Sequence, residues 1–112
     1  MARPVKWRRV EYVPVNKYFA PCPKGNCGHH SGLEEIQLKV EELEAMRLKD
    51  IEELNQEECA ERMQVSRQTF QNIIEEARKK VATALIEDRA ISVGGGKIWR
   101  DQLNGEGLNM FL

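Results

Sequence analysis

The sequence has 112 residues, 17 of them basic and 18 acidic, and a formal net charge of −1. Its length predicts one domain with a single modest core, and no apolar run is long enough to cross a bilayer. Three cysteines, an odd number, without an apolar export signal argue against a disulfide framework, so we expect a cytoplasmic protein that does not enter membranes.

The charge is distributed unevenly along the chain. Residues 1–17 hold five bases and one acid, whereas residues 33–62 hold eleven acids and four bases. A basic arm suits contact with phosphates, while the acidic stretch must either face away from a nucleic acid or repel it. The net charge therefore does not exclude a nucleic-acid partner.

The first 14 residues are predicted to form a short strand or an extended arm, because apolar and basic side chains partly alternate in VKWRRVEYV. Arg8 and Arg9 in this arm are candidate phosphate contacts. An edge strand protected by its charges would explain the same pattern without any ligand.

Residues 15–32 contain prolines and glycines that oppose regular structure. Two cysteines and two histidines within nine residues form a candidate metal site: Cys22, Cys27, His29 and His30. Thiolate and imidazole ligands suit tetrahedral zinc. An iron–sulfur cluster with mixed ligation is a second interpretation, and an exposed loop without a metal is a third. Adjacent histidines diverge, so three ligands from this loop and a fourth from elsewhere is the easier arrangement.

Residues 33–40 alternate apolar and polar side chains, which predicts a strand. This strand could pair with the arm at residues 5–13 or with a strand near residue 91. Residues 41–53 then repeat apolar side chains at helical spacing, and two glutamates in the first turn favour the helix dipole. We expect a supporting helix here.

Residues 54–81 are predicted to form two helices joined by a tight turn. Asn55 and Glu58 have the spacing of a capping box for the first helix. Ser66 can cap a second, longer helix that extends from residue 67 to about residue 87. Apolar residues at helical spacing predict its buried face: Phe70, Ile73, Ile74, Ala77, Val81 and Leu85.

The other side of this second helix carries side chains that can read bases: Arg67, Gln68, Gln71 and Asn72. In the major groove, arginine pairs with guanine, and glutamine or asparagine pairs with adenine. Arg78 and Lys79 follow and could contact phosphates. The polar face of a helical hairpin can also be only solvated, but the amide-rich composition favours a helix-turn-helix reader.

Residues 90–99 contain a short β-like stretch around Ile91 and Val93, followed by three glycines. The final residues show no periodicity, so residues 94–112 are expected to form a flexible tail. An apolar C-terminal end that docks on a partner or a sister subunit is the alternative.

The run from residue 40 to residue 91, together with ARPVKWRRVEYVP and YFAP, resembles a prokaryotic family of small predicted DNA-binding proteins, domain of unknown function 134. The helix-turn-helix of that family is similar to the promoter-reading fourth region of bacterial sigma factors. The resemblance implies a transcription regulator and supports placing the four base-reading candidates at the DNA. It also implies that Cys59, at a position where the family commonly has alanine, is a small buried residue. The metal site is not implied by the resemblance.

These patterns predict a mainly α fold: a helix-turn-helix domain of three helices, with a small β element formed by the N-terminal arm and short flanking strands. The expected divisions are the arm and Cys/His loop (1–32), the helix-turn-helix domain (33–93) and the tail (94–112). The expected function is sequence-specific binding of double-stranded DNA by a homodimeric regulator that responds to metal or redox state through the loop. The alternative is a metal-binding protein–protein adaptor that does not read DNA. We do not expect an enzyme, because the sequence places no nucleophile beside a base in an evident pocket.

Overall fold

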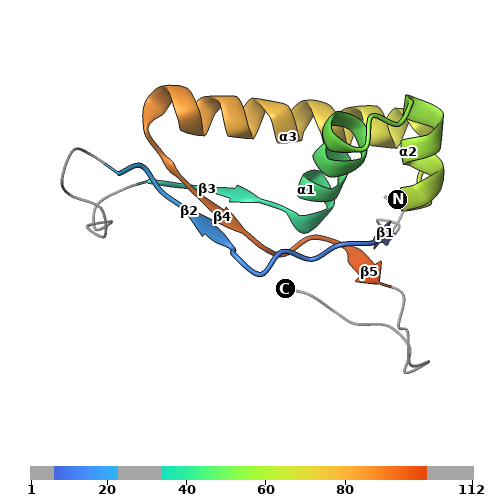
Figure 1. Cartoon of the computed structure of the whole chain (residues 1–112), viewed down its shortest axis with the longest axis horizontal. Coiled ribbons are helices and arrows are strands. Elements are labelled where there is room, and N and C mark those ends of the chain that lie inside the picture. Colours follow the sequence, from blue (N-terminus) through green and yellow to red (C-terminus); the bar gives the residue numbers. More distant parts are fainter. Residues whose placement is uncertain (1–6, 23–33, 101–112) are drawn as a thin grey trace, which may run out of the picture.

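The computed structural model describes residues 7–22 and 34–100, which form three α-helices, one π-helical stretch and five short strands (Figure 1). In chain order these are β1 (Arg8–Val10), β2 (Tyr18–Phe19), β3 (Glu35–Leu38), α1 (Val40–Met46), the π-helical η1 (Arg47–Ile51), α2 (Gln56–Met63), α3 (Arg67–Glu87), β4 (Ala90–Val93) and β5 (Ile98–Arg100). Three helices with small strands confirm the predicted fold class at this level.

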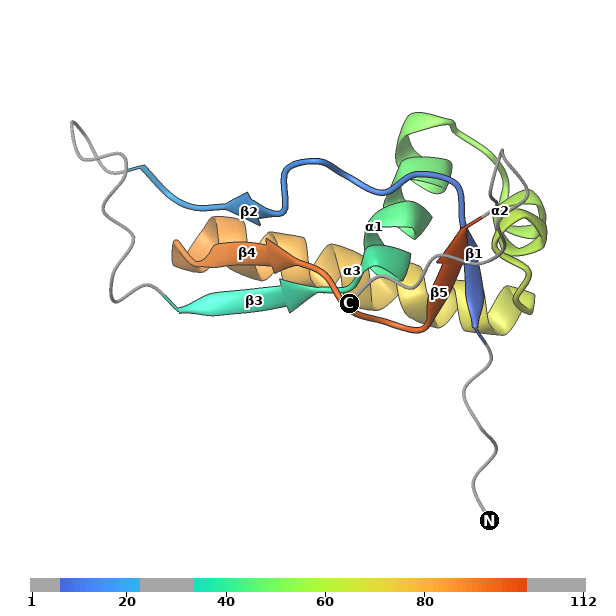
Figure 2. The same ribbon diagram turned by 90° about the horizontal axis from the view of Figure 1, so that it is seen from below.

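The strands form two small sheets. β2 pairs antiparallel and β3 pairs parallel with β4, giving the order β2-β4-β3, while β1 pairs parallel with β5. Of the two partners considered for the strand at 33–40, the strand near residue 91 is the one observed, with Ile36 opposite Ile91. α3 spans the molecule: the three-stranded sheet lies along its C-terminal half, and α1 and α2 lie beside its N-terminal half (Figures 1 and 2).

Apolar side chains gather in two clusters along α3. The first joins α1, η1, α2 and α3 and contains Ala45, Leu48, Cys59, Ala60, Met63, Phe70, Ile73 and Ile74. The second joins the strands to α1 and α3 and contains Val10, Leu38, Val40, Ala77, Val93 and Ile98. The predicted buried face of α3 is confirmed at Phe70, Ile73, Ile74 and Ala77, and Cys59 is fully buried as the family resemblance implies.

Three expectations differ from the structure. Leu85 is 74% exposed, because Ala84 takes the buried position at the C-terminal end of α3. Residues 18–19 form the short strand β2, since backbone pairing with β4 outweighs the nearby prolines and glycines. The tail assigned to residues 94–112 begins too early, because residues 98–100 form β5 and pair with residues 8–10 of the arm. Residues 101–112 lie outside the described residues.

Three glutamates of α1 are buried, and each meets a cation from a different element. Glu41 pairs with Arg8 of β1 at 3.2 Å and Glu42 pairs with Lys80 of α3 at 2.8 Å. Glu44 pairs with Arg47 of η1 at 2.8 Å and also accepts a hydrogen bond from the backbone N–H of Glu11 at 2.8 Å. A buried carboxylate is tolerated only when it is paired and hydrogen-bonded, so α1 is fixed to its neighbours by charge as well as by packing.

Replacing Glu44 by alanine is expected to lower the free energy of unfolding by about 3 kcal/mol, because the change leaves the Glu11 N–H and part of the Arg47 guanidinium without their buried acceptor. Urea denaturation followed by circular dichroism measures this. Glu76→Ala, at an exposed position of α3, is the control and should change the free energy of unfolding by no more than about 0.5 kcal/mol. Equal effects of the two substitutions would contradict the assigned role of Glu44.

Candidate nucleic-acid interface

α2 and α3 are joined by a short turn whose geometry follows from local sequence signals. Asn55 caps α2: its side chain accepts from the N–H of Glu58 at 2.8 Å, and the Glu58 carboxylate accepts from the N–H of Asn55 at 3.1 Å. α2 ends where Gln64 adopts the left-handed conformation, with φ of 57°. Ser66 then caps α3 by accepting from the N–H of Thr69 at 3.0 Å. The capping box and the serine cap are therefore confirmed.

The four base-reading candidates lie together on the first two turns of α3, in half-buried or exposed positions. Gln68 donates to Asn72 at 3.0 Å, and Gln71 donates to the carboxylate of Glu75 at 2.6 Å. Arg67 lies 3.7 Å from Glu57 of α2, and both side chains are well exposed. On this face, amide and carboxylate groups hydrogen-bond along α3 at i,i+4 spacing, and the guanidinium of Arg67 lies beside them.

The cations expected to touch phosphates have different surroundings. Arg78 is bound to Asp50 of η1, whereas Lys79 is exposed and forms no ion pair with the described residues. Arg8 pairs with the buried Glu41. Arg9 donates to Glu11 at 2.8 Å and to the Arg62 carbonyl at 3.1 Å. Arg8 and Arg9 are therefore engaged within the protein.

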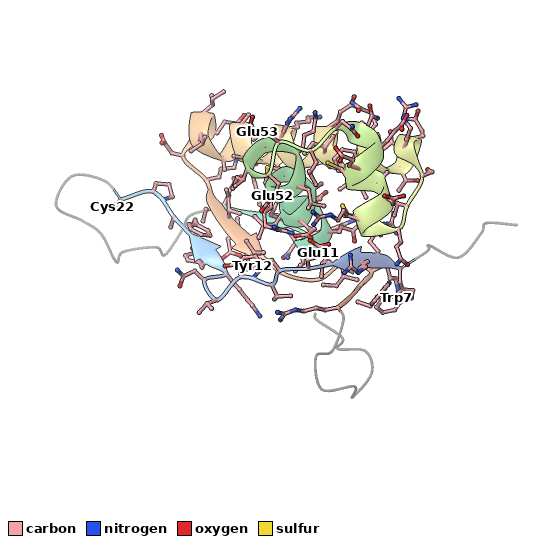
Figure 3. The ribbon with its side chains drawn as sticks, turned by 45° about the vertical axis from the view of Figure 1, so that its right-hand side comes forward. Trp7, Glu11, Tyr12, Cys22, Glu52 and Glu53 are labelled. Carbon is pink, nitrogen blue, oxygen red and sulfur yellow. The ribbon has the colours of Figure 1, made fainter. Side chains whose placement is uncertain are left out.

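The arm is attached to the helices through Glu11, which is not among the site residues predicted from the sequence. Its carboxylate accepts from Arg9, from Arg62 of α2 at 2.7 Å and from Arg47 of η1 at 3.1 Å. Figure 3 shows Glu11 on the arm directly below the helices. The available signal was that Glu11 is the only acid among the first 17 residues. In a basic segment, a lone acid suggests an internal partner.

Electrostatics at this junction favour the charged forms of its members. Burial by itself would raise the pKa of Glu11, but the hydrogen bonds and charges of Arg9, Arg62 and Arg47 outweigh it and hold that pKa below its ordinary value of 4.5. The pKa of Arg47 is raised, chiefly by its hydrogen bond to Glu44 and further by Glu11, against the opposing effect of burial. Both shifts favour the charged forms, the carboxylate of Glu11 and the guanidinium of Arg47.

Of the candidate metal ligands, only Cys22 is a described residue; Cys27, His29 and His30 lie outside the described residues. Cys22 is disulfide-bonded, contrary to the expectation of reduced cysteines, and its partner also lies outside them. Cys59 is a free, buried thiol whose pKa is raised by that burial. Within residues 7–22 and 34–100, no group of three or more metal-binding side chains is present. Cys22 lies at the opposite end of the described chain from α2 (Figure 3).

No helix in the described ranges is long and apolar enough to span a membrane.

Comparison with known proteins shows the family of the chain. The family model described as protein of unknown function DUF134 matches residues 1–101. A UPF0251 protein of Clostridium beijerinckii is 71% identical over 96 residues, which cover 86% of this chain and 62% of that protein. UPF0251 proteins of Clostridium novyi and Clostridium botulinum (strain Loch Maree) are 67% and 66% identical, also over 86% of this chain, and over 63% and 59% of their own lengths.

The chain therefore belongs to the DUF134, or UPF0251, family. It spans about three fifths of the length of these relatives. No solved structure matches it.

Replacing Glu11 by glutamine should destabilise the protein at pH 7, with the difference from the wild type shrinking as the pH falls below about 4.5. The folded-state pKa of Glu11 is lowered, so its ionised form stabilises the fold above the unfolded-state pKa. That contribution is lost as the pH falls through the folded-state pKa. Urea denaturation of both proteins at several pH values from 7 to 3 tests this. A difference that stays constant over that range would contradict it.

Proposed function

We propose that the protein is a sequence-specific, DNA-binding transcriptional regulator in which α2 and α3 act as a helix-turn-helix. The observation that carries the proposal is the gathering of base-reading side chains on the first two turns of α3, behind the short helix α2. In this arrangement the second helix enters the major groove with its N-terminal residues at the base edges. Arg67, Gln68, Gln71 and Asn72 would read bases.

Internal pairing of charge reduces the main objection to DNA binding, which is the acidity of residues 33–62: three of the eleven acids there are buried, while the other eight are exposed. Glu41, Glu42 and Glu44 are buried and each is bound to a cation, so they add little to the outward field. The same pairing engages Arg8, Arg9 and Arg78. Lys79, which is exposed, is the better candidate for a phosphate contact. With so few phosphate contacts, we expect modest affinity and a shallow dependence on salt for one subunit.

A homodimer would supply the specificity that one subunit lacks. Two helical turns extend about 11 Å, which corresponds to about three base pairs of B-DNA. Two subunits on half-sites about 34 Å apart would double the number of bases read. A palindromic operator is therefore expected, and the cytoplasm is the compartment in which such a regulator meets DNA.

Fluorescence anisotropy with a DNA fragment from upstream of the protein's own gene, and with a scrambled fragment, tests the proposal at two salt concentrations. A regulator is supported if the natural fragment is bound more tightly than the scrambled one and if binding weakens at the higher salt concentration. Absence of binding to both fragments would overturn it and favour a protein–protein adaptor.

Gln71→Ala is expected to weaken binding to the preferred DNA by about 1–3 kcal/mol and to leave binding to scrambled DNA nearly unchanged, because a base contact is lost while phosphate contacts remain. Asn16→Ala, which removes an exposed amide between β1 and β2, is the matched control and should change neither affinity. Equal loss on both DNAs would argue against base reading by Gln71.

We also propose that the Cys/His segment makes DNA binding sensitive to zinc or to oxidation. Zinc added to the reduced protein is expected to shift its DNA affinity, and Cys22→Ser is expected to abolish that shift, because it removes a thiolate ligand. Anisotropy with reductant, with zinc and with a chelator measures the effect. DNA binding that is unchanged by chelation and by Cys22→Ser would remove this part of the proposal.

A further inference from the structure

The hydrogen bond between Gln71 and Glu75 fixes which groups α3 offers to DNA beyond its second turn. The amide nitrogen of Gln71 donates to Oε2 of Glu75 at 2.6 Å. An ionised carboxylate can only accept, so the orientation of the Gln71 amide is determined by chemistry. One N–H of Gln71 is used by this bond, and its Oε1 remains an open acceptor.

Glu75 retains open acceptor positions of its own. A carboxylate has about four lone-pair sites, and Gln71 fills one of them. Many acids of this protein are bound to arginine or lysine, but in the part of the chain that the structure describes Glu75 has no ion pair. The residue is exposed, on the same side of α3 as Gln71 and one turn further along. This side chain therefore presents a negative acceptor from the surface proposed to read bases.

We propose, on the basis of the function inferred above, that Glu75 is a specificity-determining residue that selects a cytosine in each half-site. The amino group N4 of cytosine is a donor in the major groove, which matches the free carboxylate oxygen. Guanine and thymine present O6 and O4, acceptors that a carboxylate repels. Adenine has an amino group, but its acceptor N7 lies beside it, whereas cytosine has no acceptor at that edge.

The same charge penalises incorrect sequences. A carboxylate on the DNA-facing side of a helix is repelled by phosphates at every register, and this cost is offset only where a cytosine amino group meets it. Glu75 would thus weaken non-specific binding and sharpen discrimination. Gln71, held by Glu75, would read the adjacent base pair with its remaining N–H and Oε1.

Selection from a random DNA library tests this with three proteins: the wild type, Glu75→Gln and, as the matched control, Glu76→Gln. Glu76 is the next residue of α3, is also exposed and lies further around the helix. Both substitutions are nearly isosteric and remove one negative charge, and thermal unfolding verifies that both variants fold.

The wild type and Glu76→Gln are expected to enrich one site containing a cytosine in each half. Glu75→Gln should lose the preference at that single position and retain the others. In competition assays the preference for cytosine over thymine at that position should fall about tenfold, and scrambled DNA should be bound more tightly than by either other protein.

The outcomes separate this inference from the function on which it rests. If the wild type enriches no sequence, the proposed function fails. If the wild type enriches a site and Glu75→Gln enriches the same site, the function stands and the role of Glu75 is overturned. Uniform weakening at all positions in Glu75→Gln, absent in Glu76→Gln, would also overturn it, because a residue that only supports the helix would have that effect.

Discussion

The buried glutamates of α1 are the constraint on which the rest of the fold depends. Each of the three meets a cation from a different part of the chain: β1, α3 and η1. Removing water from three carboxylates is costly unless every partner arrives in position. The arm, the supporting helix and the long helix must therefore assemble together.

The ion pairs of the buried glutamates change how the charge of the sequence should be interpreted. Counted along the chain, residues 33–62 are strongly acidic and the arm is basic. In the fold, Glu41 forms an ion pair with Arg8, and Glu11 of the arm forms ion pairs with Arg9 and Arg62. Three of the four cations expected to contact phosphates, Arg8, Arg9 and Arg78, are therefore bound to acids of the protein itself. Under the proposed function, DNA recognition would depend on the hydrogen-bonding groups of α3 more than on positive charge, which favours specificity over affinity.

Local signals allowed most of the helical structure to be predicted from the sequence. These signals are the caps at Asn55 and Ser66 and the apolar spacing from Phe70 to Ala77. They depend only on residues a few positions apart, and the structure confirms them. Contacts between distant residues left no such signal. The pairing of β1 with β5 joins residues 8–10 to residues 98–100, and the Glu11–Arg62 pair spans the arm and α2. The candidate base-reading side chains were identifiable, but their mutual hydrogen bonds were not.

The segment from Glu11 to Cys22 is a second connection, besides α3, between the two ends of the described chain. α3 has 21 residues and is therefore about 30 Å long, and Cys22 lies at the end away from α2 (Figure 3). From Cys22 the chain passes back through β2, which is held by β4, to Glu11, which is bound to Arg62 of α2. If DNA binding responds to zinc or oxidation as proposed, a chemical change at Cys22 would act on α3 through this path, which is held at β2 and at Glu11. Because the pairing with β4 involves only two residues, β2 is the link that such a change would release first.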